Sequence, residues 1–292
     1  MMHGPFRTAA VLASTVLAVG GMTGAARPGT EAEVAASQPI YFVHGYNDNE
    51  SSNCASLWGK ALDYFQERGK DRDSLRTVAY YSGDKECDVD IANASTDTRI
   101  KHIAAALANR IHSEDESVEI VAHSMGGLIS RVAMLGSAKG WAGFPKGRLK
   151  VDDIVTLATP HQGIQSANKY DSVQWDSMVP GSEFLTVLNE SANRLDQEWA
   201  DGTDWSFAGS DEDETVSKDS AIDEGHHADH KYRYFRDQDH DISHTNIRRL
   251  APGGGKYNLR YWHSSEGTPH DTTNGWAPLE TAYNALSRNG DW

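Results

Sequence analysis

The sequence has little cysteine, little basic charge and no long apolar run beyond its first residues. Only two of its 292 residues are cysteine, and 27 basic residues stand against 42 acidic ones, for a formal net charge of −15. No run of Lys or Arg offers a patch for a nucleic-acid backbone or an anionic membrane surface. After residue 36, no apolar run approaches the roughly 20 residues of a membrane-spanning helix. We therefore expect no nucleic-acid partner and no integral membrane anchor.

The rest of the composition is that of a folded chain. Charged residues make up 24% and hydrophobic residues 38% of the sequence, which excludes a disordered or collagen-like protein. The length is sufficient to bury the core of one α/β domain of moderate size, and no internal repeat is visible. We expect a monomer.

The first 36 residues have the order of a secretory signal peptide. A short polar stretch with Arg7 precedes an apolar run over residues 9–19, and small residues fill positions 23–26. That run is too short for a stop-transfer helix. Cleavage fits after Ala26 or after Ala36, so residues 1–36 are assigned to the signal peptide and 37–292 to a single domain. The protein is expected to be secreted and extracellular.

The two cysteines fit an extracellular location. Cys54 and Cys87 are the only available pair, and an oxidising exterior favours joining them. A disulfide that closes the loop between these two cysteines would stabilise the folded protein by roughly 3–4 kcal/mol in the chain-entropy model. Two free thiols remain the alternative, and neither cysteine lies in a catalytic motif.

Short apolar runs alternate with helical patterns along the chain. Residues 100, 103, 107 and 111 repeat at helical spacing behind Thr96 or Asp97 as a cap, and 279, 283 and 286 mark a final helix. Such alternation predicts an α/β fold, with about six strands in a mostly parallel sheet and helices on both faces. Its active site should lie at the carboxyl ends of the strands. The predicted strands are 39–43, 75–81, 118–122, 151–157, 205–208 and 232–235.

Residues 122–127 carry the sharpest chemical signal. They read Ala-His-Ser-Met-Gly-Gly between a predicted strand and a helix, which is the nucleophile-elbow pattern with Ala in the first Gly position. Small neighbours are needed because the serine occupies a tight, strained turn. This pattern predicts Ser124 as a nucleophile.

An acyl-transfer site also needs N–H donors for the developing oxyanion. One should be the backbone N–H of Met125, directly after the nucleophile. The other should come from the loop after an earlier strand, where Gly45 permits unusual backbone and Tyr46 supplies the N–H. His44 in the same loop is expected to be structural.

Four segments together resemble the secreted bacterial lipase/esterase branch of the α/β-hydrolases. They are residues 40–46, the elbow at 122–127, the Ala-Thr-Pro-His-Gln-Gly stretch at 158–163, and residues 178–189. The resemblance implies ester hydrolysis by a Ser–Asp–His triad in that chain order, with an acyl-enzyme intermediate. It also implies a minimal form of the fold that lacks the first two strands of larger members.

The family pattern points to the two partners of the serine. After the next strand, an Asp followed two residues later by an apolar or small residue and then Val matches Asp213 best, with Asp211 as the second candidate. After the last strand, a His with an apolar residue three positions on favours His244, with His240 as the second candidate. Activity should fall as the pH drops through about 6–7, where a histidine base becomes protonated.

Other readings stay open at this stage. The same triad could serve an acyltransferase, an amidase or a polyester hydrolase, and an inactive hydrolase fold could be a binding protein. No cofactor and no metal are expected, although His226 or His230 with Asp223, Glu224 or Asp229 could hold a structural Ca²⁺ or Zn²⁺. Residues 163–193 could form a lid or pack beneath the site, so the acyl-chain preference cannot be read.

Overall fold

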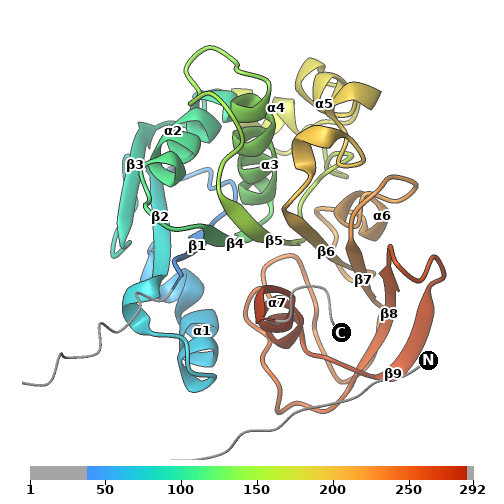
Figure 1. The fold of residues 1–292 in the computed structure, drawn as a ribbon. Coiled ribbons are helices and arrows are strands. Elements are labelled where there is room, and N and C mark those ends of the chain that lie inside the picture. The colour runs from blue at the N-terminus through green and yellow to red at the C-terminus, as the bar shows by residue number, and fades with distance from the viewer. Residues whose placement is uncertain (1–37, 288–292) are drawn as a thin grey trace, which may run out of the picture. The chain divides into compact units, whose positions relative to one another are not determined.

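The computed structural model describes residues 38–287 of the chain. The expected signal peptide lies outside the described residues. One sheet runs through the described part in the order β3-β2-β1-β4-β5-β6-β7-β8-β9 (Figure 1). The strands are β1 (Ile40–Val43), β2 (Leu75–Tyr81), β3 (Val89–Ala94), β4 (Val118–His123), β5 (Val151–Leu157), β6 (Asp204–Ser210), β7 (His230–Tyr234), β8 (Tyr257–His263) and β9 (His270–Gly275).

The sheet is larger than the sequence predicts. From β3 through β7 the neighbours pair in parallel, and β8 and β9 continue the sheet antiparallel. All the predicted strands are present, but β3, β8 and β9 were not predicted. β3 and β9 lie at the two edges of the sheet. β9 is polar and mostly exposed, whereas β3 is mostly half-buried and is interrupted by the exposed Asp90 and Asn93, so neither has the continuous apolar run of a fully buried strand.

Helices cover both faces of the sheet because side chains alternate along each strand. On β1, Ile40 and Phe42 pack with α1 (Cys54–Glu67) and α7 (Pro278–Ser287). Tyr41 and Val43 point the other way, into a core shared with α2 (Ile100–His112) and α3 (Met125–Ala138). Figure 1 shows the two helix layers on opposite sides of the strands.

The helices predicted over residues 100–111, after the elbow and at the C-terminal end are present as α2, α3 and α7. Only the start of α2 differs from the prediction. α2 begins after Arg99 without a side-chain cap. The proposed caps have other partners: Thr96 donates to the carboxylate of Glu50, and Asp97 accepts from the backbone N–H of Val173 at 3.3 Å. Three short helices, α4 (Val173–Ser177), α5 (Glu183–Leu188) and α6 (Lys218–Ala221), lie in the connections after β5 and β6.

Cys54 and Cys87 form a disulfide. The bond joins the buried first residue of α1 to the connection between β2 and β3. The Cys54 backbone N–H donates to the Lys85 carbonyl at 2.9 Å beside it, so covalent and hydrogen bonds fasten the same two segments. Within residues 38–287, no helix has both the length and the apolar character needed to cross a bilayer.

Candidate active site

Ser124 lies at the turn between β4 and α3 in a strained conformation. Its φ of 55° and ψ of −129° are rarely adopted by a residue with a side chain. The turn is held because the Ser124 N–H donates to Leu157 at 3.0 Å and the Thr159 hydroxyl donates to the Ser124 carbonyl at 2.9 Å. A Cβ on Gly126, two positions after Ser124 in the elbow pattern, would lie 2.2 Å from the Val43 carbonyl oxygen, and a Cβ on Gly127 would overlap the Thr159 side chain.

Three side chains from three separate loops meet at this turn. The Ser124 hydroxyl lies 2.9 Å from Nε2 of His244, and Nδ1 of His244 lies 2.7 Å from Oδ2 of Asp213. The loops follow β4, β6 and β7, so the carboxyl ends of parallel strands bring together residues that are distant in sequence. His244 follows the last parallel strand rather than the last strand of the sheet, because β8 and β9 come after it.

Asp213 is fixed by the backbone of its own loop. Its Oδ1 accepts hydrogen bonds from the N–H groups of Thr215 at 2.8 Å and Val216 at 2.9 Å. Oδ2 is therefore left to face His244, and the side chain is buried there. A buried carboxylate held in this way can orient an imidazole and stabilise its cationic form.

The two second candidates have other partners. Asp211 accepts two hydrogen bonds from Arg233, at 2.8 and 3.1 Å. His240 bonds Asp237 through Nδ1 and the Gly254 carbonyl through Nε2, and its ring stacks on Tyr257. The structure thus brings Ser124, Asp213 and His244 together, and it does not bring Asp211 or His240 to them.

The loop after β1 abuts the serine. A Cβ on Gly45 would lie 2.6 Å from Cβ of Ser124, so only glycine allows the backbone this close. Met125 is the first residue of α3, and its N–H belongs to the helix N-terminus, where donors face outward. Gly45 and Ser124 thus lie against each other, and Tyr46 and Met125, whose N–H groups are the expected oxyanion donors, directly follow these two residues in the chain.

His44 supports this loop, as expected for a structural residue. It is buried, its Nε2 lies 3.0 Å from Asp84, and its ring stacks on Tyr80 at 4.1 Å. The Tyr80 hydroxyl donates to the Gly45 carbonyl at 2.6 Å. Burial raises the pKa of Asp84, but its hydrogen bonds with His44 and the backbone bring it below its usual range.

The segment at 158–163 forms a buried wall of the site. His161 is fully buried, stacks on Phe207, and bonds the Thr156 hydroxyl at 3.1 Å. Burial lowers the pKa of His161 to about 3, so this ring stays neutral. The Gln162 amide donates to Asp223 at 3.0 Å and to the Glu224 carbonyl at 2.8 Å, which ties this wall to the turn after α6.

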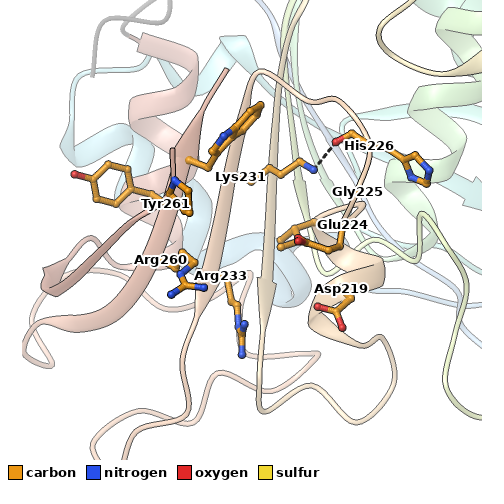
Figure 2. Close-up of a pocket in the computed structure, with 11 residues that line it drawn as sticks. Asp219, Glu224, Gly225, His226, Lys231, Arg233, Arg260 and Tyr261 are labelled. Carbon is orange, nitrogen blue, oxygen red and sulfur yellow. Dashed lines mark hydrogen bonds between the residues drawn. The ribbon is translucent and has the colours of Figure 1, made fainter. Parts of the chain in front are cut away.

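Figure 2 shows that turn on one side of a cavity, with β7 and β8 on the other side. The cavity has a volume of about 320 Å³ and is lined by both charged and apolar side chains. Lys231 donates to the carbonyls of Asp223 and His226, the second of which is drawn in the figure. The cavity residues labelled there include Asp219, Glu224, Gly225, His226, Lys231, Arg233, Arg260 and Tyr261.

The histidines considered for a metal belong to separate pairs. His226 bonds Asp223 at 3.0 Å, whereas His230 bonds Asp204 at 3.0 Å and contacts His263. Across residues 38–287, no cluster of three or more His, Cys, Asp or Glu side chains is arranged to hold a metal ion.

A second, more open cavity of about 770 Å³ adjoins the triad histidine. His244 and Thr245 line it together with the acidic residues Glu212, Glu214, Asp237, Asp239 and Asp241. On this side, the approach to His244 is therefore polar and acidic.

A parallel sheet with a strained serine between a strand and a helix, partnered by a histidine and an aspartate from later loops, is the arrangement of an α/β-hydrolase. The chain belongs to the class 2 lipase family, whose family model matches residues 37–241. The match includes Ser124 and Asp213 and ends just before His244.

Three solved structures are similar to the chain at low identity. The mature lipase BlEst2 of Bacillus licheniformis is 17% identical, with a TM-score of 0.45 over 66% of this chain and 82% of that one. A gene product of Listeria innocua, lin2722, is 14% identical, with a TM-score of 0.47 over 86% and 94% of the two chains. Aspergillus fumigatus lipase B is 16% identical, with a TM-score of 0.43 over 63% and 41%. No curated protein matches the chain significantly.

Proposed function

We propose that the protein is a secreted serine hydrolase of carboxylic esters that acts through Ser124, His244 and Asp213. The observation that carries the proposal is the continuous hydrogen-bond chain from Asp213 through His244 to Ser124, with distances of 2.7 and 2.9 Å. Membership of the lipase family supports an ester or lipid substrate. The disulfide is compatible with an extracellular location,.

The proposed reaction follows from the positions of these atoms. His244 accepts the proton of the Ser124 hydroxyl through Nε2 as the serine oxygen attacks the ester carbonyl. Asp213 keeps Nδ1 protonated and stabilises the imidazolium. The oxyanion is held by the N–H groups of Tyr46 and Met125. His244 then protonates the leaving alcohol, and a water molecule releases the acyl group by the same steps.

The test is the initial rate of hydrolysis of p-nitrophenyl esters of increasing chain length, measured for the wild type and Ser124→Ala, with and without a chelator. We expect the variant to lose at least about 10⁴-fold in kcat while its thermal unfolding stays near that of the wild type. The chelator should leave the rate unchanged.

Each other outcome has a distinct meaning. An unchanged rate in Ser124→Ala would overturn the assignment of the nucleophile. No turnover of any ester by the wild type would overturn ester hydrolysis in favour of amide hydrolysis, acyl transfer or binding alone. The chain-length optimum of an active enzyme separates a short-chain esterase from a long-chain lipase.

A further inference from the structure

His123, the residue before the proposed nucleophile, contacts the backbone of the proposed catalytic base. Its side chain is 5% exposed, and its Nε2 lies 2.6 Å from the carbonyl oxygen of His244. The two rings also pack against each other, with centroids 4.9 Å apart and planes inclined by 50°. The contact joins the end of β4 directly to the loop after β7.

The geometry defines the protonation state of His123. A carbonyl oxygen only accepts, so Nε2 must carry a hydrogen for this contact to be a hydrogen bond. Burial, followed by the nearby charges of His244, Arg248 and His44, pushes the pKa of His123 well below its usual value. The ring is therefore neutral with its hydrogen on Nε2, and it adds no positive charge beside His244.

The backbone of His244 lies in a loop of mixed exposure, in which His240 and Ile242 are buried. Asp239, Asp241 and Thr245 are exposed residues around it. A second contact comes from the loop that carries Asp213, where the Glu212 carboxylate accepts a hydrogen bond from the N–H of Ile242 at 2.7 Å. Thus His123, which precedes Ser124, and Glu212, which precedes Asp213, each form a hydrogen bond with the loop that carries His244.

We propose that His123 is a positioning residue of the active site: its Nε2–H holds the His244 carbonyl and so fixes the imidazole between Ser124 and Asp213. The inference rests on the proposed function of the triad. Asp213 restrains the ring of His244 through Nδ1, and His123 restrains its backbone. Because a displacement of about 1 Å in a catalytic group can cost about 10²-fold in rate, losing this anchor should impair catalysis rather than substrate binding.

Two variants of His123 separate the hydrogen bond from the shape of the side chain. His123→Phe keeps a planar ring but has no donor, whereas His123→Gln places an amide N–H near the position of Nε2. We expect His123→Phe to lower kcat on p-nitrophenyl esters by about 10- to 100-fold, with KM nearly unchanged and the acidic limb of the kcat–pH profile displaced. His123→Gln should recover most of kcat and the wild-type profile.

A measurement without substrate keeps this inference distinct from the proposed function. Nitrogen-15 NMR of the imidazoles in the wild type and Ser124→Ala should show His123 neutral and protonated on Nε2 down to about pH 5, whether or not esters are hydrolysed. Protonation on Nδ1, or a cationic ring at neutral pH, would overturn the proposal. The proposal would also be overturned if His123→Phe kept the kcat and pH profile of the wild type. It would be overturned as well if His123→Phe and His123→Gln lost kcat to the same extent and lost thermal stability to the same extent.

Discussion

Two aspartates in one loop have different partners at the residue scale. Asp213 is buried, accepts two backbone N–H groups and faces His244. Asp211, two positions earlier, forms a bidentate pair with Arg233 across neighbouring strands β6 and β7. The difference arises because β6 ends at Ser210 and the chain then turns, which directs successive acids to different sides.

We therefore expect Asp213→Asn and Asp211→Asn to behave differently. Asp213→Asn should lower kcat by about 10⁴-fold, because the amide no longer holds the imidazole in the required tautomer. Asp211→Asn should keep wild-type kcat and lose at most about 1 kcal/mol of stability, the usual range for a partly exposed ion pair. Steady-state rates and urea unfolding of both variants check this, and a larger rate loss in Asp211→Asn would reverse the assignment.

Gly45 allows the loop after β1, which carries the expected oxyanion donor Tyr46, to lie close to Ser124. In Gly45→Ala the new methyl group would lie 2.6 Å from Cβ of Ser124, so the loop must move away. We expect about a 10²-fold fall in kcat, the effect of losing one oxyanion donor. Gly59→Ala is the matched control, since a Cβ there, within α1, has no neighbour within 4 Å. Equal rates for both variants would place the donor elsewhere.

The sequence could point to the three residues of the candidate site because each follows a strand that its apolar composition reveals. Ser124, Asp213 and His244 were placed from such strands and from the family resemblance, and the structure brings these three together. The contact between His123 and His244 could not be predicted. It joins residues 121 positions apart, and nothing in the local pattern of either one signals the other.

At the scale of elements, a buried ion pair joins α3 to the turn after α6. Arg131 on α3 is fully buried and lies 3.8 Å from the buried carboxylate of Asp223. A second nitrogen of Arg131 donates to the Leu188 carbonyl at 3.1 Å. Burial lowers the pKa of Arg131. Burial would raise the pKa of Asp223, but the charge of Arg131 and the hydrogen bonds from Gln162 and His226 keep it below its usual range.

Removing one partner of such a pair leaves an uncompensated charge in the interior. We expect Asp223→Asn to lower the free energy of unfolding by about 3–5 kcal/mol. Asp219→Asn, in the neighbouring helix α6 and exposed, should change it by no more than about 0.5 kcal/mol. Urea unfolding at pH 7 measures both, and similar values for the two variants would show that the pair does not stabilise the fold.

The elements that sequence patterns could predict are those that bury apolar side chains. The central strands and the amphipathic faces of α2 and α7 were predicted for that reason. β9 reads His-Asp-Thr-Thr-Asn-Gly and is mostly exposed, so its backbone pairing with β8 is what defines it. The same applies to β3, where exposed polar residues alternate with half-buried ones, and an edge strand needs no continuous apolar run.

At the scale of the whole molecule, acidic groups collect at the amino ends of the central strands, away from the triad. Glu119 on β4 is in register with Asp153 on β5, and Asp153 is in register with Asp204 on β6. Glu119 and Asp153 are each 3% exposed, and Lys70 approaches Glu119 at 3.4 Å. Burial, reinforced by the neighbouring carboxylates, raises the pKa of Asp153 to about 8, and burial raises that of Glu119 to about 7.

This cluster should make the stability of the protein fall as the pH rises. Both carboxyl groups titrate near pH 4 in the unfolded chain and at higher pH in the folded one, so the folded state binds more protons in between. Their contribution is therefore favourable at mildly acidic pH and is lost as the pH rises through about 7 to 8. Acids whose pKa is lowered, such as Asp84 and Asp88, give a constant stabilisation above about pH 4 that is lost only as the pH falls below it.

Urea unfolding from pH 7 to pH 8.5 tests this behaviour, because the buried histidines His123 and His161, whose pKa is lowered, make stability rise with pH only up to about pH 6.5,. We expect the free energy of unfolding to decrease from pH 7 to pH 8.5 by roughly 1 kcal/mol or more, since each pKa unit corresponds to about 1.4 kcal/mol. Asp153→Asn should remove most of the slope and be more stable than the wild type at pH 8. Asp152→Asn, the exposed neighbour on the same strand, removes a smaller contribution to the raised pKa of Asp153 and should keep most of the slope. Stability that is constant or rises between pH 7 and pH 8.5 would mean that Asp153 is ionised in the folded protein, and its charge would then have to be stabilised by groups other than Lys70.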